Sequence, residues 1–155
     1  FNAQLYAPEE MCSYKDTADF FWVTDHGTRG RIDMVVYSFP YVSGRTFTLD
    51  YLVAMRDSVL GEHIQGAFPG SYMTTEKRFT PSYEAISKNG EYCGVVRGLW
   101  EMEGDMMGGP FVSHAHLDEK NQRVVVTETF VYAPNTKKAK LLRRGEASLY
   151  TFCMD

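Results

Sequence analysis

The dipeptide Asn89-Gly90 constrains the fold of this chain more than any other feature of its sequence. It separates two runs, Tyr83 to Lys88 and Tyr92 to Met102, in which apolar and polar residues tend to alternate. Both central residues of a type I′ turn need a positive φ angle, which Asn and Gly adopt most readily. The two runs are therefore predicted to be neighbouring antiparallel strands joined by a tight hairpin.

Similar patterns predict further strands on both sides of this hairpin. Asp19 to Asp25 and Arg31 to Tyr41 are expected to pair across the turn Gly27-Thr28-Arg29-Gly30. The second of these runs is apolar on both faces, which is typical of a central strand. The remaining strands are expected at Ser71 to Phe79, Phe111 to Leu117 and Arg123 to Tyr132.

The apolar spacing becomes helical from Thr48, a residue suited to the N-cap, as far as Leu60. Gly61 or Gly66 is expected to end this first helix. The order of strands and helices is then β-β-α-β-β-β-β-β-α once a C-terminal helix is added.

The C-terminal helix is expected to begin after a cap at Asn135 or Thr136. Gly145 falls in its middle and costs about 1 kcal/mol relative to Ala. Close approach of the helix to the sheet is the expected compensation. The apolar stripe of this helix consists of Ala139, Leu142, Leu149 and Phe152.

These elements predict a single α+β domain over residues 1–155, with an antiparallel sheet of six or seven strands and two helices. A doubly wound parallel sheet is excluded because no long helix separates successive strands. Hydrophobic residues make up 44% of the chain, which excludes disorder, and a net charge of −4 does not suggest a nucleic-acid partner. The longest uncharged apolar run is too short to cross a membrane.

The run Gly104 to His114, followed by Val131 to Pro134, resembles the signature of an uncharacterised lipoprotein family of Bacteroidetes catalogued as a domain of unknown function. Members of that family are longer and begin with a lipoprotein-type signal, whereas this chain begins at Phe1 without one. The resemblance implies the C-terminal half of a cell-envelope lipoprotein, anchored by a lipid outside this chain. It brings no catalytic residue. Further matching segments are Phe20 to Trp22, Tyr37 to Tyr41, Thr46 to Leu52, Arg56 to Val59 and Gly70 to Arg78.

The element order is also similar to the architecture shared by the photosystem subunit PsbP and the nuclear transport factor Mog1. Proteins of that architecture act as binding or accessory domains as a rule. The likeness implies a binding role by fold analogy alone.

Among the motifs of the sequence, His114-Ala115-His116 most strongly suggests a metal-binding or catalytic site. Residues two apart on a strand point to one face, so His114, His116 and Asp118 could share a metal ion. A further ligand would have to come from elsewhere, with His26, His63 and Glu128 as candidates. The ordinary alternative is a pair of partly exposed histidines on a solvated strand.

The glycine-rich segment Gly104 to Gly109 is the candidate ligand-binding loop, as a backbone nest for an anion or a flap over a pocket. The alternative is an irregular connection whose glycines supply positive φ angles. Trp22 and Trp100 are further candidate ligand-binding residues, because aromatic residues are abundant in this chain and tryptophan favours interfaces. The alternative is that these side chains pack in an aromatic core. The full candidate set is Gly104, Met106, Met107, Gly108, Gly109, Trp100 and Trp22.

Other reactive residues give weaker signals. Glu101 and Glu103 share a strand face and, with Glu128, could form an acid–base pair for glycoside hydrolysis. The more ordinary expectation is that the strand carboxylates are solvated or form ion pairs with Arg97 and Arg123 across the sheet. The three cysteines have no metal-type spacing and are expected to be buried thiols; they are Cys12, Cys93 and Cys153.

The sequence thus favours a non-enzymatic binding or structural domain without a cofactor. Its expected partners are the N-terminal region of the same lipoprotein, or an envelope protein or glycan, and its expected location is the cell envelope. The alternative is a metal-dependent hydrolase that uses the His-x-His strand. A third possibility is a domain that only packs against its own N-terminal half.

Overall fold

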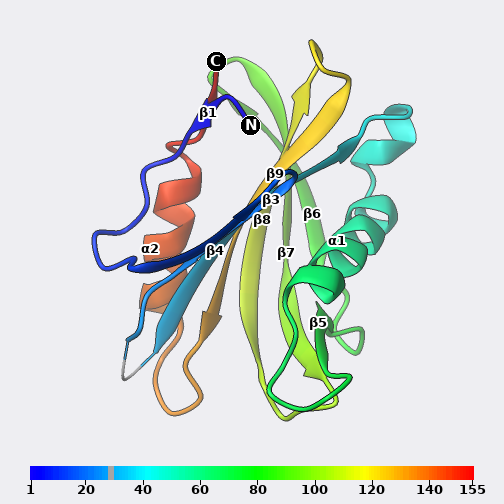
Figure 1. Ribbon diagram of the computed structural model, residues 1–155. Coiled ribbons are helices and arrows are strands. Elements are labelled where there is room, and N and C mark those ends of the chain that lie inside the picture. Colours follow the sequence, from blue (N-terminus) through cyan, green and yellow to red (C-terminus); the bar gives the residue numbers. More distant parts are fainter. Residues whose placement is uncertain (28–29) are drawn as a thin grey trace.

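The computed structural model describes residues 1–27 and 30–155 and contains an eight-stranded antiparallel sheet (Figure 1). The strand order is β2-β3-β4-β9-β8-β7-β5, and β6 pairs with the first half of β7. The α+β class is confirmed, with one strand more than expected. The strands are β2 (Ser13–Thr17), β3 (Phe20–Thr24), β4 (Arg31–Pro40), β5 (Tyr72–Thr75), β6 (Ser82–Lys88), β7 (Glu91–Glu103), β8 (Gly108–Asp118) and β9 (Arg123–Tyr132).

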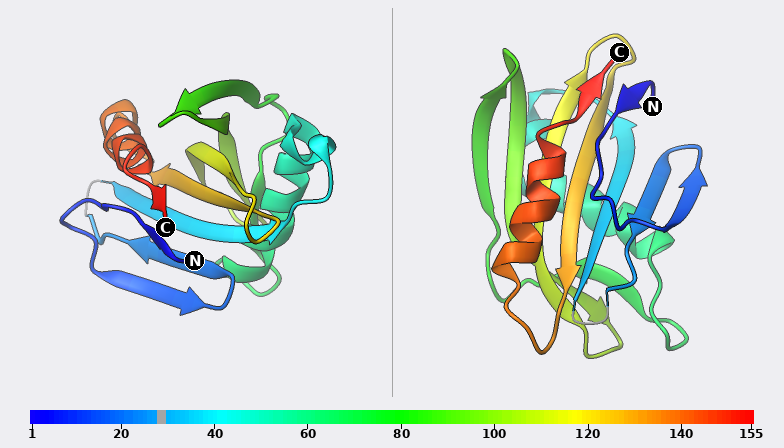
Figure 2. Two further views of the ribbon diagram at one scale, coloured as in Figure 1. Left: turned by 90° about the horizontal axis from the view of Figure 1, so that it is seen from above. Right: turned by 90° about the vertical axis from the view of Figure 1, so that its left-hand side faces the viewer.

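Two helices lie on opposite faces of this curled sheet (Figure 2). Helix α1 (Leu49–His63) follows a short 3₁₀ helix, η1 (Gly44–Phe47), and fills the concave face. Helix α2 (Ala139–Leu149) packs on β9, β4 and β8 from the other side. The terminal strands β1 (Ala3–Gln4) and β10 (Cys153–Met154) pair with each other. Among the described residues, no helix has the length and apolar character needed to cross a membrane.

The predicted hairpins are confirmed. Asn89 and Gly90 have φ angles of 54° and 81° and join β6 to β7. Strand β3 pairs with β4, and the central position expected for β4 is found, because β3 and β9 flank it. The turn predicted between β3 and β4 contains Thr28 and Arg29, which lie outside the described residues.

Helix α1 begins where the sequence predicts. The Thr48 side chain accepts a hydrogen bond from the backbone N–H of Tyr51, as expected for an N-cap. The helix ends at neither of the two glycines expected to end it, Gly61 and Gly66, because it continues to His63 and the backbone N–H of Ile64 still bonds to Leu60. Gly61 therefore lies inside the last helical turn.

Helix α2 begins later than predicted. Its N-cap position is Lys138, which makes no capping bond through its side chain, so the expected cap at Asn135 or Thr136 is wrong. Phe152, expected on the stripe of this helix, lies beyond the helix end but is still buried. The chain thus enters the helix from the turn after β9 without a side-chain cap.

The close contact expected at Gly145 is confirmed. A Cβ atom at this position would lie 2.1 Å from the Thr129 side-chain oxygen on β9. Only a glycine lets the helix approach the strand this closely, and this contact offsets its low helix propensity.

The largest of the three apolar clusters among the described residues lies on the concave face, under α1. Helix α1 contributes Leu52 and Leu60 to it, and the sheet contributes mainly aromatic and β-branched side chains. Aromatic residues of this core include Phe20, Tyr37, Phe39, Trp100, Phe111 and Phe130. Part of the aromatic excess is therefore explained by core packing.

A charged pair lies in the middle of this apolar core. Arg56 of α1 donates from Nε and Nη2 to both carboxylate oxygens of Glu128 on β9, at 2.7 to 3.0 Å. Its Nη1 atom donates to Thr75, and its guanidinium group lies 3.9 Å from the centroid of the Phe111 ring. Arg56 is 1% exposed and Glu128 is fully buried. Burial raises the pKa of Glu128, and the charge of Arg56 opposes this change.

The predicted ion pair of Glu128 with Arg97 or Arg123 is therefore wrong, since neither arginine contacts Glu128. Arg97 bonds to Glu146 of α2, and Arg123 bonds to Asp118. The reason is geometric, because α1 brings Arg56 over the face of the sheet on which Glu128 lies.

We expect Glu128→Gln to destabilise the fold by about 3–5 kcal/mol, because it leaves Arg56 buried without its main counter-ion. Replacing both residues, as Arg56→Met with Glu128→Leu, should cost much less than either single change. Urea unfolding of the four proteins of this cycle measures both effects. Glu10→Gln, which disrupts the exposed pair with Arg144, is the control and should have little effect. Additive single-mutant costs would contradict the predicted coupling.

We expect Gly145→Ala to destabilise the protein by about 1–3 kcal/mol, although Ala is the better helix former, because its Cβ would overlap Thr129. Gly44→Ala is the matched control, since nothing lies within 4 Å of a Cβ there. Thermal unfolding of both variants gives the comparison. Equal midpoints would show that α2 can move away from β9 at little cost.

Candidate functional site

The two sites predicted from sequence lie in different parts of the fold. His114 and His116 are on β8 and face α2 on the convex side of the sheet. The turn that contains Gly104 joins β7 to β8 at one end of the sheet, beside the loop before β5. They are therefore separate candidates.

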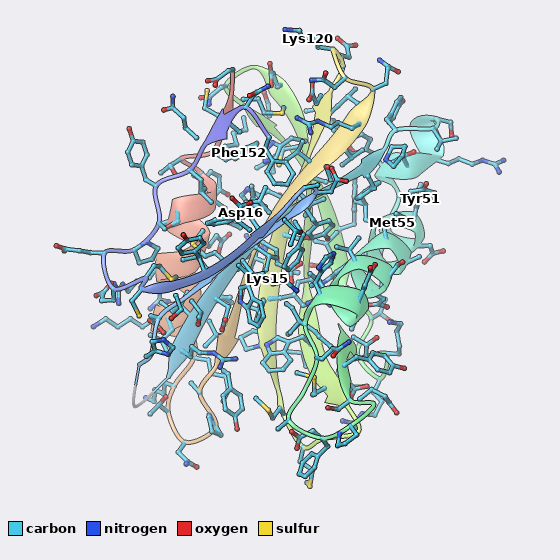
Figure 3. The ribbon with its side chains drawn as sticks, in the orientation of Figure 1. Lys15, Asp16, Tyr51, Met55, Lys120 and Phe152 are labelled. Atoms are coloured by element: carbon cyan, nitrogen blue, oxygen red, sulfur yellow. The ribbon has the colours of Figure 1, made fainter. Side chains whose placement is uncertain are left out.

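The predicted histidine pair is brought together, and it is buried rather than solvated. His114 is fully buried and His116 is 7% exposed. The Tyr150 ring meets the His114 ring edge-on with centroids 5.0 Å apart, and Phe152 lies 4.7 Å from the His116 ring. Phe152 is labelled in Figure 3, in the segment that follows α2. The end of α2 and the segment after it therefore cover both imidazoles.

A third soft ligand joins the histidines from the neighbouring strand. Cys93 of β7 is directly opposite His116 in the sheet register and is fully buried. One potential ligand atom from each of Cys93, His114 and His116 lies within 4.8 Å of the other two. Sequence analysis missed Cys93 because its spacing from the histidines matches no local metal motif; only the pairing of β7 with β8 could have indicated it.

Burial keeps these three groups uncharged near neutral pH. Desolvation, assisted by the nearby charge of Lys88, lowers the pKa of His114 to about 4 and that of His116 to about 3. Desolvation raises the pKa of the Cys93 thiol to about 11, against the opposing effect of Lys88. Neutral imidazoles have the lone pairs that a metal ligand needs.

The other residues considered as metal ligands are engaged elsewhere. Asp118 accepts hydrogen bonds from Arg123 and Asn121. The ring of His63 stacks on Phe20, and His26 shares a hydrogen bond with Ser13. Glu128 is bound by Arg56 on the opposite face of the sheet. Of the metal ligands predicted from sequence, the structure brings His114 and His116 together and holds Asp118 in hydrogen bonds to Arg123 and Asn121.

The segment Gly104 to Gly109 is only partly a loop. Gly104 has a φ angle of 86°, as expected for a glycine in a tight turn, but Gly108 and Gly109 already belong to β8. Met106 is 98% exposed at the tip, whereas Met107 packs against the concave core. The turn therefore presents one apolar side chain to solvent.

The two tryptophans of the candidate set lie apart from each other, since β4, β9 and β8 separate their strands in the sheet order. Trp100 of β7 is 1% exposed and donates from its indole to the carbonyl of Val131. Trp22 of β3 is half-buried and donates to the buried carboxylate of Asp33. In this structure Trp100 packs and bonds within the core.

An apolar surface does exist beside the Gly104 turn. Phe68, in the segment that leads into β5, and Tyr72, the first residue of β5, are 59% and 43% exposed. This segment contacts the turn, because a Cβ on Gly104 would lie 3.4 Å from Ser71. A hollow of about 380 Å3 is lined by residues 61, 65–71 and Tyr72. We call the surface of Phe68, Tyr72 and Met106 the β5–β7 end surface.

The strand carboxylates and the three cysteines agree only in part with the predictions from sequence. Arg78 bonds to the carboxylate of Glu76 and lowers its pKa to about 2, whereas the neighbouring Glu76 raises the pKa of Glu101. Glu128, on the far side of β8, is not part of this pair. The prediction that all three thiols are buried is wrong, because Cys12 and Cys153 are exposed and only Cys93 is buried.

A family model described as a domain of unknown function, DUF4837, matches residues 1–151. The chain belongs to this family. No curated protein matches the chain. Membership of DUF4837 confirms the prediction of a domain of unknown function, and the description of the family names no activity.

We expect the metal-free protein to lose stability as the pH falls from 7 to 5. In the unfolded chain both histidines become protonated near pH 6.5, while in the folded protein burial keeps them neutral to about pH 4. Each should therefore cost about 2 kcal/mol at pH 5. Urea unfolding with a chelator at several pH values measures this loss, and His116→Leu should roughly halve it. An unchanged slope in this variant would contradict the assignment.

Proposed function

We propose that this chain is a non-catalytic binding domain of a bacterial cell-envelope lipoprotein, and that it binds through the β5–β7 end surface. One observation supports the site above all others: Phe68, Tyr72 and Met106 are exposed together on two segments that contact each other. Large apolar side chains grouped on a surface mark interaction sites more often than scattered ones do.

The composition of this surface fits a protein partner. Phe, Tyr and Met are enriched in protein–protein interfaces, and Met adapts its shape to different partners. The hollow of about 380 Å3 beside Tyr72 could receive a side chain of the partner. We propose that the partner is the N-terminal region of the same lipoprotein or another envelope protein; an envelope glycan is the competing ligand.

The cellular location is proposed from the family resemblance. The lipoprotein character, the bacterial group Bacteroidetes and the lipid anchor outside this chain all rest on it. Membership of DUF4837 agrees with that resemblance, although its description gives neither source nor location.

The geometry favours binding over the hydrolase alternative. A metal-dependent hydrolase would need His114 and His116 to reach a substrate, but Tyr150 and Phe152 cover both rings. The carboxylate of Asp118 is held by Arg123. Access of an envelope polymer to these histidines is therefore restricted, since His114 is fully buried and His116 is 7% exposed.

We expect a true partner to raise the unfolding temperature of the chain. A ligand at about 100 times its Kd adds about 2.7 kcal/mol to the free energy of unfolding. Thermal scans should be run with the N-terminal region of the longer protein and with peptidoglycan fragments. The shift should disappear in the double variant Phe68→Ser with Met106→Ser.

Phe79→Ser is the matched control for that experiment. Phe79 and Phe68 are both 59% exposed, but Phe79 lies after the C-terminal end of β5, whereas Phe68 lies before its N-terminal end. This variant should keep the shift. Equal loss in both proteins, or an unchanged shift in the double variant, would exclude the β5–β7 end surface. A shift with peptidoglycan fragments alone would identify a glycan ligand in place of a protein, and turnover of any fragment would overturn the non-catalytic proposal.

A further inference from the structure

Unsatisfied polar atoms gather at one place in this fold. Among the described residues, four buried side-chain nitrogen or oxygen atoms have no hydrogen-bond partner, and three of them belong to His114 and His116. The fourth is Oγ1 of Thr127, which is opposite His114 in the register of β8 and β9. Buried polar groups in native proteins are almost always satisfied, so this grouping indicates a missing partner.

The donors at this place are those that soft metal ions prefer. Cys93 adds a thiol to the two imidazoles, and one ligand atom from each residue lies within 4.8 Å of the others. An ion bonded to sulfur at about 2.3 Å and to nitrogen at about 2.0 Å holds its donors about 3.5 Å apart. Small side-chain rotations would therefore be enough to bring all three donors to one ion.

We propose that Cys93, His114 and His116 form a binding site for a single thiophilic metal ion, Zn²⁺ or Cu⁺. Thiolate and imidazole ligands favour both ions over Mg²⁺ and Ca²⁺, which prefer oxygen. On binding, the Cys93 thiol releases its proton to solvent and its sulfur bonds to the ion, while each imidazole contributes a lone pair. No oxidation or reduction takes place.

The surroundings make this a closed site. The rings of Tyr150 and Phe152 cover it, and Lys88 of β6 donates to the carbonyl of Leu149, which fixes the end of α2 above it. The positive charge of Lys88 opposes a cation, and the thiolate of Cys93 offsets this repulsion. A small cavity of about 110 Å3, lined by His116, Lys88 and Cys153, leaves room for a water molecule as a further ligand.

Such a site would stabilise the domain without contributing catalysis. Three protein ligands and a water are the pattern of catalytic zinc sites, whose fourth position is open to substrate. Here Tyr150 and Phe152 cover the imidazoles, and this burial favours a structural role. The bound ion would join β7 to β8 under the segment that follows α2. This role is independent of the β5–β7 end surface and goes beyond the proposed binding function.

Metal titration of the purified, chelator-treated chain tests the proposal. Zn²⁺ and Cu⁺ are added separately against competing chelators, with bound metal measured by mass spectrometry and with Co²⁺ as a spectroscopic substitute for zinc. We expect one ion per chain, a thiolate-to-cobalt absorption band, and a rise in unfolding temperature of about 5–10 °C at 100 times the Kd. The ion with the higher affinity identifies the metal.

Variants of the three cysteines locate the thiol ligand. Cys12→Ser with Cys153→Ser leaves Cys93 as the sole thiol and should keep full binding and the cobalt band. Cys93→Ser and His116→Gln should each lower the affinity more than about 100-fold. The double variant Phe68→Ser with Met106→Ser should bind metal normally, which separates this test from that of the proposed function.

A thiol-protection measurement keeps the test valid if Cys93→Ser does not fold. In the protein with Cys93 as sole thiol, the metal should slow alkylation of this residue. Retention of the metal by Cys93→Ser, loss of binding in the double cysteine variant, or binding of neither ion would overturn the proposal. In the last case water fills the space between the imidazoles.

Discussion

The ion pair between Arg56 and Glu128 is the interaction around which the concave half of the fold is organised. Removing two charges from water is costly, and the pair repays this only because its hydrogen bonds are bidentate and further donors and acceptors surround it. Thr75 of β5 accepts from Arg56 and donates to Asp57, the next residue of α1. The network therefore links the helix, a central strand and an edge strand in a single arrangement.

This constraint explains why the two faces of the sheet differ. On the concave face the buried charged groups have partners, with Arg56 bonded to Glu128 and Trp22 donating to Asp33. On the convex face, under α2, the buried polar groups are neutral, and several lack partners. The first arrangement is complete within the protein, whereas the second leaves room for an added ion.

Much of the fold could be predicted because it depends on local rules. Asn89-Gly90 fixed one hairpin through the φ angles of a type I′ turn, and Thr48 marked the start of α1 by its capping bond. Gly145 indicated close packing because a glycine in mid-helix needs a compensating contact. The edge strand β2 was missed because only its first residue is even half-buried, so its sequence carries no regular apolar pattern.

The buried ion pair could also have been predicted from the sequence. Arg56 lies four residues after Leu52 and four before Leu60, on the apolar stripe of the helix, and Glu128 shares a strand face with Val126 and Phe130. Opposite charges placed on two inward faces suggest a pair. The start of α2 gave no such signal, because its N-cap residue makes no side-chain bond.

The sequence by itself determined the antiparallel hairpins, the beginning of α1, the α+β class and the shared face of His114 and His116, because each depends on residues close together in the chain. Only the tertiary structure decided that Glu128 meets Arg56 and that Cys93 joins the histidines. It also decided that the segment before β5 lies against the turn that contains Gly104. These contacts join residues far apart in the chain, and they depend on strand register and on the helix that covers each face. Local pattern specifies neither of these.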